Sequence, residues 1–99
     1  MAAMAEAERQ TGVSLRHFTV APLRRPNELP RYGVLIEQNE VPDLELGRRL
    51  VQAFDQELRR TVLIYGNTRN NRILGSPLLA RLQPGSWQRL IDSEVQGRG

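Results

Sequence analysis

The chain has 99 residues, a formal net charge of +3 and no cysteine. This length fits a single domain with a modest core, and the lack of cysteine excludes disulfides, thiolate metal sites and a cysteine nucleophile. No apolar run is long enough to cross a membrane, and the first ten residues lack the basic and apolar regions of a secretory signal, so a cytoplasmic setting is expected.

All 14 basic residues are arginine. A GC-rich coding sequence is one explanation of this bias, and it is the one we favour. Selective contact of arginine with an anion or a nucleic acid is the other. In either case the absence of lysine excludes catalysis by a lysine of this chain.

The N-terminal part predicts a helix followed by a strand. Residues 1–11 are rich in Ala and Glu and are followed by Gly12, a residue typical of the position after a helix. Residues 13–21 contain alternating side chains that favour a strand, and Pro22 is expected to end it.

A loop and a second strand follow. The stretch PLRRPNELPR contains three prolines, which cannot donate to a sheet and therefore favour a mobile loop. In residues 31–38 the apolar side chains of Val34, Leu35 and Ile36 are contiguous, so both faces of this strand should be covered. The direct connection predicts antiparallel pairing with the first strand.

Residues 44–60 form the clearest predicted helix. Asp43 is a suitable N-cap. The apolar stripe of this helix consists of Gly47, Leu50, Val51, Phe54 and Leu58. Glu45 with Arg49 and Asp55 with Arg59 are expected to pair across one turn, and the acids Asp55 and Glu57 indicate an ordinary solvated face.

The stretch GNTRNNR, residues 66–72, allows two interpretations. In the first, Arg69 and Arg72 bind a phosphate on a loop rich in backbone N–H groups. In the second, which we favour, the stretch is a helix-to-strand corner whose Asn and Gly residues adopt left-handed conformations. Tyr65 then packs beneath the corner, Arg69 bonds to carbonyls of the turn, and Arg72 faces solvent.

A third strand and a last helix complete the prediction. Residues 76–83 alternate as a strand, and residues 86–95 predict a helix with Ser86 as its N-cap and Trp87 on its buried face. The order is α-β-β-α-β-α, an α+β fold with a small three-stranded mixed sheet and helices packed on it. The open sheet edges are expected to support a homo-oligomer.

Two further groups of residues could be read as catalytic or metal-binding. His17 is the only histidine and has no neighbouring acids, so a half-exposed structural position is favoured over a metal site. Glu37, Glu40 and Asp43 could be read as hydrolytic carboxylates, but strand-end solvation and a helix cap explain them better. No catalytic residue and no metal ligand is predicted.

Four segments in order carry a family resemblance: GVSLRHFTVAP, PRYGVLIEQ, YGNTR and ILGSPLLARLQPGSWQRL. Together they resemble the C-terminal lid domain of the Gretchen Hagen 3 family, the auxin-responsive acyl acid amido synthetases and their bacterial relatives. The motif positions are Phe18, Thr19, Tyr32, Tyr65, Arg69, Gly75, Pro84, Gly85, Ser86 and Trp87, where Ser86 and Trp87 replace the family's Thr and Phe.

The sequence also departs from the family pattern. The large nucleotide-binding domain, the hinge and the lysine-containing tail of the family are not in this sequence. The chain is therefore expected to be either a fragment of a longer enzyme or a small protein that keeps the lid core as one domain, residues 1–99.

The resemblance implies a two-domain ligase. A separate large domain would use ATP and Mg²⁺ to adenylate a carboxylic acid, and the lid would close the site while an amino acid attacks. This chain alone would bind no cofactor and be inactive.

The alternative is a free-standing interaction module. It would bind a nucleic acid or another anion through its arginine-rich loops, with Arg24, Arg25, Arg31, Arg69 and Arg72 as contacts. Few aromatic side chains are present to stack bases, which disfavours the nucleic-acid version.

Overall fold

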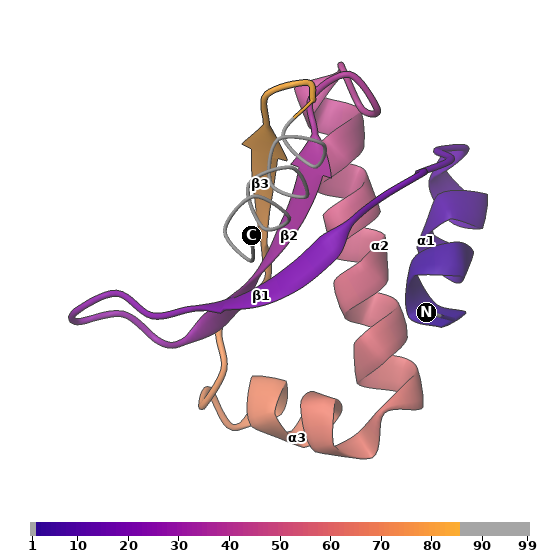
Figure 1. The fold of residues 1–99 in the computed structure, drawn as a ribbon. Coiled ribbons are helices and arrows are strands. Elements are labelled where there is room, and N and C mark those ends of the chain that lie inside the picture. Colours follow the sequence, from indigo (N-terminus) through magenta and orange to yellow (C-terminus); the bar gives the residue numbers. More distant parts are fainter. Residues whose placement is uncertain (1, 86–99) are drawn as a thin grey trace, which may run out of the picture.

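The computed structural model describes residues 2–85 and shows a three-stranded sheet with helices packed beside it (Figure 1). The elements are α1 (Ala2–Thr11), β1 (Thr19–Leu23), β2 (Arg31–Glu37), α2 (Leu44–Thr61), α3 (Leu63–Asn70) and β3 (Leu78–Leu82). The central strand β2 pairs antiparallel with β1 and parallel with β3. The predicted mixed α+β sheet and its order of elements are confirmed, with α3 as an addition. The helix predicted at 86–95, with Ser86 and Trp87, lies outside the described residues.

The core lies between α2 and the sheet. The predicted apolar stripe of α2 is confirmed, because Leu50 and Phe54 are fully buried and meet Val34 and Ile36 of β2 in one cluster. Asp43 is the N-cap, since its carboxylate accepts a hydrogen bond of 3.0 Å from the backbone N–H of Glu45. Long apolar side chains at helical spacing therefore fix how α2 lies on the sheet.

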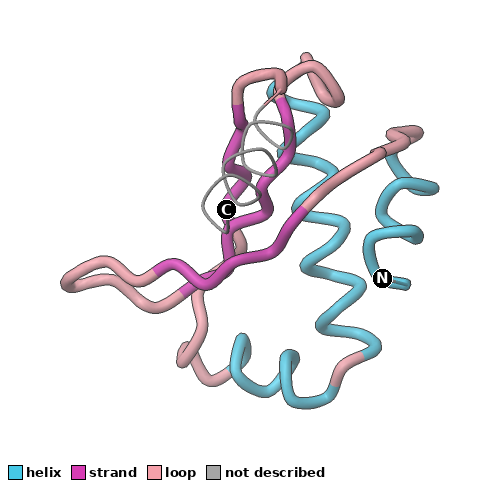
Figure 2. The backbone as a smooth tube through the Cα atoms, in the orientation of Figure 1, coloured by secondary structure: helices cyan, strands magenta, loops and turns pink. Residues whose placement is uncertain are grey.

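The helix α1 packs along α2 rather than on the sheet (Figure 2). It buries Met4 completely, together with Ala3 and Ala7. Because Ala3 and Ala7 are small, the backbones of α1 and α2 can lie close together. Because α1 covers one side of α2 and the sheet covers another, α2 is the central element of the fold.

The first strand differs from its prediction at both ends. It begins at Thr19 rather than at residue 13, because the preceding N–H groups are used elsewhere: those of Leu15 and Arg16 donate to the carboxylates of Glu8 and Glu40. It also runs past Pro22, which pairs with Tyr32. A proline is tolerated there because, among the described strands, β1 has a neighbour on one side only.

The stretch predicted as a turn-rich corner is mostly helical. Val62 has extended backbone angles and ends α2, after which the chain resumes as α3 through Asn70. The corner itself is shorter and comes later than predicted. Its left-handed residue is Arg72, with φ of 57°, rather than an asparagine or a glycine. The N–H groups of Ile73 and Leu74 then donate to the carbonyl of Thr68 and close the helix end.

Gly66 allows α3 to approach the end of α2. A Cβ atom at this position would lie 2.9 Å from the backbone carbonyl oxygen of Arg59, closer than real Cβ contacts. Since the obstacle is backbone, a larger residue must move one helix away from the other. The spacing of the two helices therefore depends on the absence of a side chain at Gly66.

We predict that Gly66→Ala lowers the free energy of unfolding by about 1–3 kcal/mol, because overpacking outweighs the gain in helix propensity. Asn67→Ala, at the exposed next position of α3, is the control and should be neutral or slightly stabilising. Urea unfolding measures both. A Gly66→Ala chain as stable as the parent would show that the helices are not held at this distance.

Candidate functional site

A buried cluster of charged and polar groups joins α2 to α3. The guanidinium of Arg69 donates two hydrogen bonds to the carboxylate of Asp55, from Nε to Oδ1 at 3.0 Å and from a terminal nitrogen to Oδ2 at 2.9 Å. The hydroxyl of Tyr65 donates to the same Oδ1 at 2.5 Å. The side chains of Arg69 and Asp55 are only 15% and 9% exposed. We call these three residues the Asp55 cluster.

The cluster explains a family motif in physical terms. Tyr65 and Arg69 are four residues apart on α3, so they lie on the same face and reach one carboxylate together. The prediction that Arg69 bonds to carbonyls of the turn is wrong. Its guanidinium is occupied by Asp55, and an anion at Arg69 would have to compete with that carboxylate.

Protonation equilibria at the cluster reflect both burial and pairing. Burial raises the pKa of Asp55, but the hydrogen bonds from Arg69 and Tyr65 outweigh it and hold that pKa below its ordinary value. Burial is the main cause that raises the pKa of the Tyr65 hydroxyl well above its ordinary value, and the hydrogen bond to Asp55 raises it further. Asp55 is therefore charged and Tyr65 neutral near neutral pH.

Two predictions about the charged face of α2 are wrong. Asp55 pairs with Arg69 instead of Arg59, whose guanidinium donates to the side-chain oxygen of Asn70 at 2.8 Å. Asp55 and Glu57 are also buried, at 6% and 8% exposure, rather than solvated. Glu57 pairs with Arg60. The predicted pair of Glu45 with Arg49 is present, at the outer limit of 4.0 Å.

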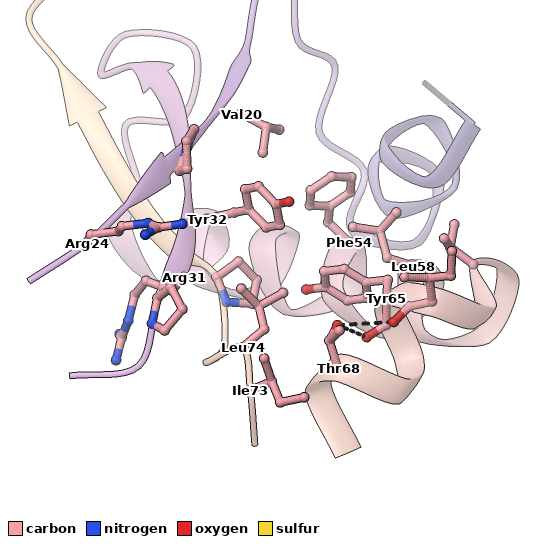
Figure 3. Close-up of a pocket in the computed structure, with 15 residues that line it drawn as sticks. Val20, Arg24, Arg31, Tyr32, Phe54, Leu58, Tyr65, Thr68, Ile73 and Leu74 are labelled. Atoms are coloured by element: carbon pink, nitrogen blue, oxygen red, sulfur yellow. Dashed lines mark hydrogen bonds between the residues drawn. The ribbon is translucent and has the colours of Figure 1, made fainter. Parts of the chain in front are cut away.

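One concavity lies between the β1–β2 hairpin and α3, and we call it the hairpin groove. Its volume is about 680 Å³. Figure 3 shows Arg24 and Arg31 on the strand side and Phe54, Leu58 and Tyr65 on the helix side. The groove is lined by Val20, Pro22, Arg24, Pro30, Arg31, Tyr32, Phe54, Leu58, Val62, Ile64, Tyr65, Thr68, Ile73, Leu74 and Pro77.

A second concavity of about 640 Å³ runs between α2 and β3 and is more polar. Arg48, Arg59 and the Asp55–Arg69 pair line it, so Arg69 is reached from this side. Arg72 is exposed and lines neither of the two concavities. The structure therefore places Arg69 and Arg72 in different surroundings and does not join them into one phosphate site.

The carboxylates at the end of β2 and after it accept hydrogen bonds from backbone N–H groups. Glu37 accepts a hydrogen bond of 3.2 Å from the N–H of Gly85, Glu40 accepts one from the N–H of Arg16, and Asp43 caps α2. This arrangement supports capping rather than hydrolysis. Within residues 2–85 there is no group of three or more His, Cys, Asp or Glu that could hold a metal ion.

The remaining positions of the family motif that the structure describes lie against the core, in the sheet or in the loops that connect its elements. Phe18 packs against the core and Thr19 begins β1, while Tyr32 on β2 lines the hairpin groove. The N–H of Gly75 donates to the carbonyl of Pro30 at 2.8 Å, which ties the segment after α3 to the hairpin. Gly85, which follows Pro84, has φ of 84°, a conformation that favours glycine.

Comparison with protein families identifies the family of this chain. A family model described as the GH3 family C-terminal domain matches residues 1–99. The chain belongs to this family. No curated protein and no solved structure matches the chain significantly.

Membership in the GH3 family confirms the resemblance seen in the sequence and implies an N-terminal domain as partner of this one.

Sequence reasoning identified Tyr65 and Arg69 but missed Asp55, which the GH3 domain uses to hold both. A signal for it was present, because Asp55 follows Val51 by four residues and so lies at the margin of the apolar stripe. None of the helices within residues 2–85 is long and apolar enough to cross a membrane.

We predict that Asp55→Asn lowers the free energy of unfolding at pH 7 by roughly 2–4 kcal/mol, because Arg69 loses its charged partner in a buried setting. The native pKa of Asp55 lies below its unfolded value of about 3.9, so this contribution is complete above about pH 5 and is lost as pH falls through the native pKa.

The measurement is denaturant unfolding of both chains between pH 2 and pH 7. Glu45→Gln, which removes half of an exposed pair, is the matched control and should change stability by less than about 0.5 kcal/mol. A difference between wild type and Asp55→Asn that stays constant with pH would contradict the account.

Proposed function

We propose that this GH3 domain is the lid of an acyl acid amido synthetase, an adenylate-forming ligase that joins a carboxylic acid to an amino acid at the expense of ATP. The match of residues 1–99 to the family's C-terminal domain carries the proposal. In the proposed enzyme the N-terminal domain binds the reactants. This domain closes over them, excludes water and positions the attacking amine.

The proposal assigns the bond chemistry to the N-terminal domain and a closing role to this chain. In the proposal, Mg²⁺ and ATP are bound by the N-terminal domain in a cytoplasmic enzyme, where the ion would offset phosphate charge. This chain contributes a rigid platform, in which the Asp55 cluster fixes α3 against α2.

One of the five arginines that the nucleic-acid alternative uses as contacts is already paired within the domain. The side chain of Arg69 is only 15% exposed and is paired with Asp55, so a phosphate backbone would have to compete with that carboxylate. Arg72 is exposed after α3 and is the member of the predicted binding pair that could meet a phosphate at closure. We propose that Arg72 makes this contact.

The test is ATP–pyrophosphate exchange and amide formation, with this chain, with the N-terminal domain of a GH3 protein, and with the two mixed. We expect exchange by the N-terminal domain alone and amide formation only in the mixture. Exchange by this chain alone would overturn the lid assignment. Arg72→Ala should lower the amide rate about tenfold, the value of one charge-assisted hydrogen bond, without changing Tm. Arg48→Ala serves as control and should leave the rate unchanged.

A further inference from the structure

Exposed apolar side chains gather around the hairpin groove. Among residues 2–85, seven large hydrophobic residues are exposed, and four of them line this groove: Tyr32, Val62, Ile64 and Ile73. Ile64 and Ile73 are 77% and 59% exposed. Exposed apolar side chains that share one concavity mark an interaction site more often than scattered ones do.

The charged residues that line the groove are all basic. Arg24 and Arg31 line it, and neither aspartate nor glutamate does. The Nε–H group of Arg31 is buried and finds no acceptor within the described part of the chain. The groove therefore suits an occupant that combines apolar side chains with a carboxylate.

A second copy of this chain is a poor occupant. A twofold dimer built on this groove places the same surface on both sides, so it would bring Arg24 and Arg31 of both copies into one interface. Like charges brought together at an interface weaken the binding, and the groove lining offers no acid to balance them. The occupant is accordingly a different surface.

We propose that the hairpin groove is the docking surface for the N-terminal domain of the GH3 protein. It receives an apolar segment of that domain that carries a carboxylate side chain, which pairs with Arg24 and Arg31. Ile64 lies on α3, the helix held by the Asp55 cluster, and Ile73 lies on the segment after it; together they form the apolar wall. Figure 3 shows Ile73 in this wall. This inference rests on the proposed function and adds the face on which the domain closes.

The test uses cysteine protection, because the chain has no cysteine of its own. Ile64→Cys and Ile73→Cys each place one thiol at the groove, and Leu44→Cys places one at an exposed apolar position that does not line it. The rate of labelling by a maleimide is measured for each chain alone and with the N-terminal domain of a GH3 protein, while amide formation reports that the two have assembled.

We expect the N-terminal domain to slow labelling at Ile64→Cys and Ile73→Cys at least about tenfold and to leave Leu44→Cys unchanged. Assembly with restored amide formation but no protection at the groove would overturn this inference and leave the proposed function standing. Protection that grows with the concentration of this chain alone would assign the groove to a second copy and overturn it as well. Absence of both assembly and amide formation would overturn the proposed function and the inference together.

As a second measurement, Arg24→Glu should weaken the complex about tenfold or more, since it places an acid against the proposed carboxylate. Arg49→Glu, an exposed arginine of α2 outside the groove, is the matched control and should have little effect. Equal effects of the two substitutions would show that only overall charge matters and would contradict the proposed contact.

Discussion

The ion pair between Asp55 and Arg69 determines how α3 lies against α2. It is buried, doubly hydrogen-bonded and joined by the hydroxyl of Tyr65, and it ties α3 to α2. A buried carboxylate is costly without such partners, so the helix carrying them must stay in place for the fold to be stable. One wall of the hairpin groove is built on that helix.

Close packing of the α3 backbone against α2 also holds α3 in place, in addition to the ion pair. Gly66 lets α3 lie against the carbonyl of Arg59, and the N–H of Gly75 bonds the following segment to Pro30 in the hairpin. The segment from α3 to Gly75 is therefore held at both of its ends. An apolar groove held this way is preorganised for binding, which lowers the entropic cost of closing on a partner. That property suits the role of a domain that closes over another.

The sequence predicted the fold wherever periodic apolar side chains decided it. The stripe of α2 follows from apolar spacing, the cap at Asp43 from residue type, and the buried strand at Val34 and Ile36 from a contiguous apolar run. It failed where long-range contacts override local preference. Asn and Gly suggested a corner at 66–72, but the pairing of Arg69 with Asp55, fourteen residues earlier, stabilises a helix there. The site residues Tyr65 and Arg69 were found through the resemblance, whereas their partner Asp55 required the structure.

The most direct test of this account is hydrogen exchange of the α3 amides in Arg69→Met, which keeps the length of the side chain but removes its charge. If the ion pair holds α3, the amides of Leu63–Asn70 should lose protection relative to wild type while those in the middle of α2 keep theirs. Unchanged protection throughout α3 would contradict the claim that Asp55 and Arg69 hold this helix. A uniform loss across α2 and α3 would contradict the claim that the pair acts locally.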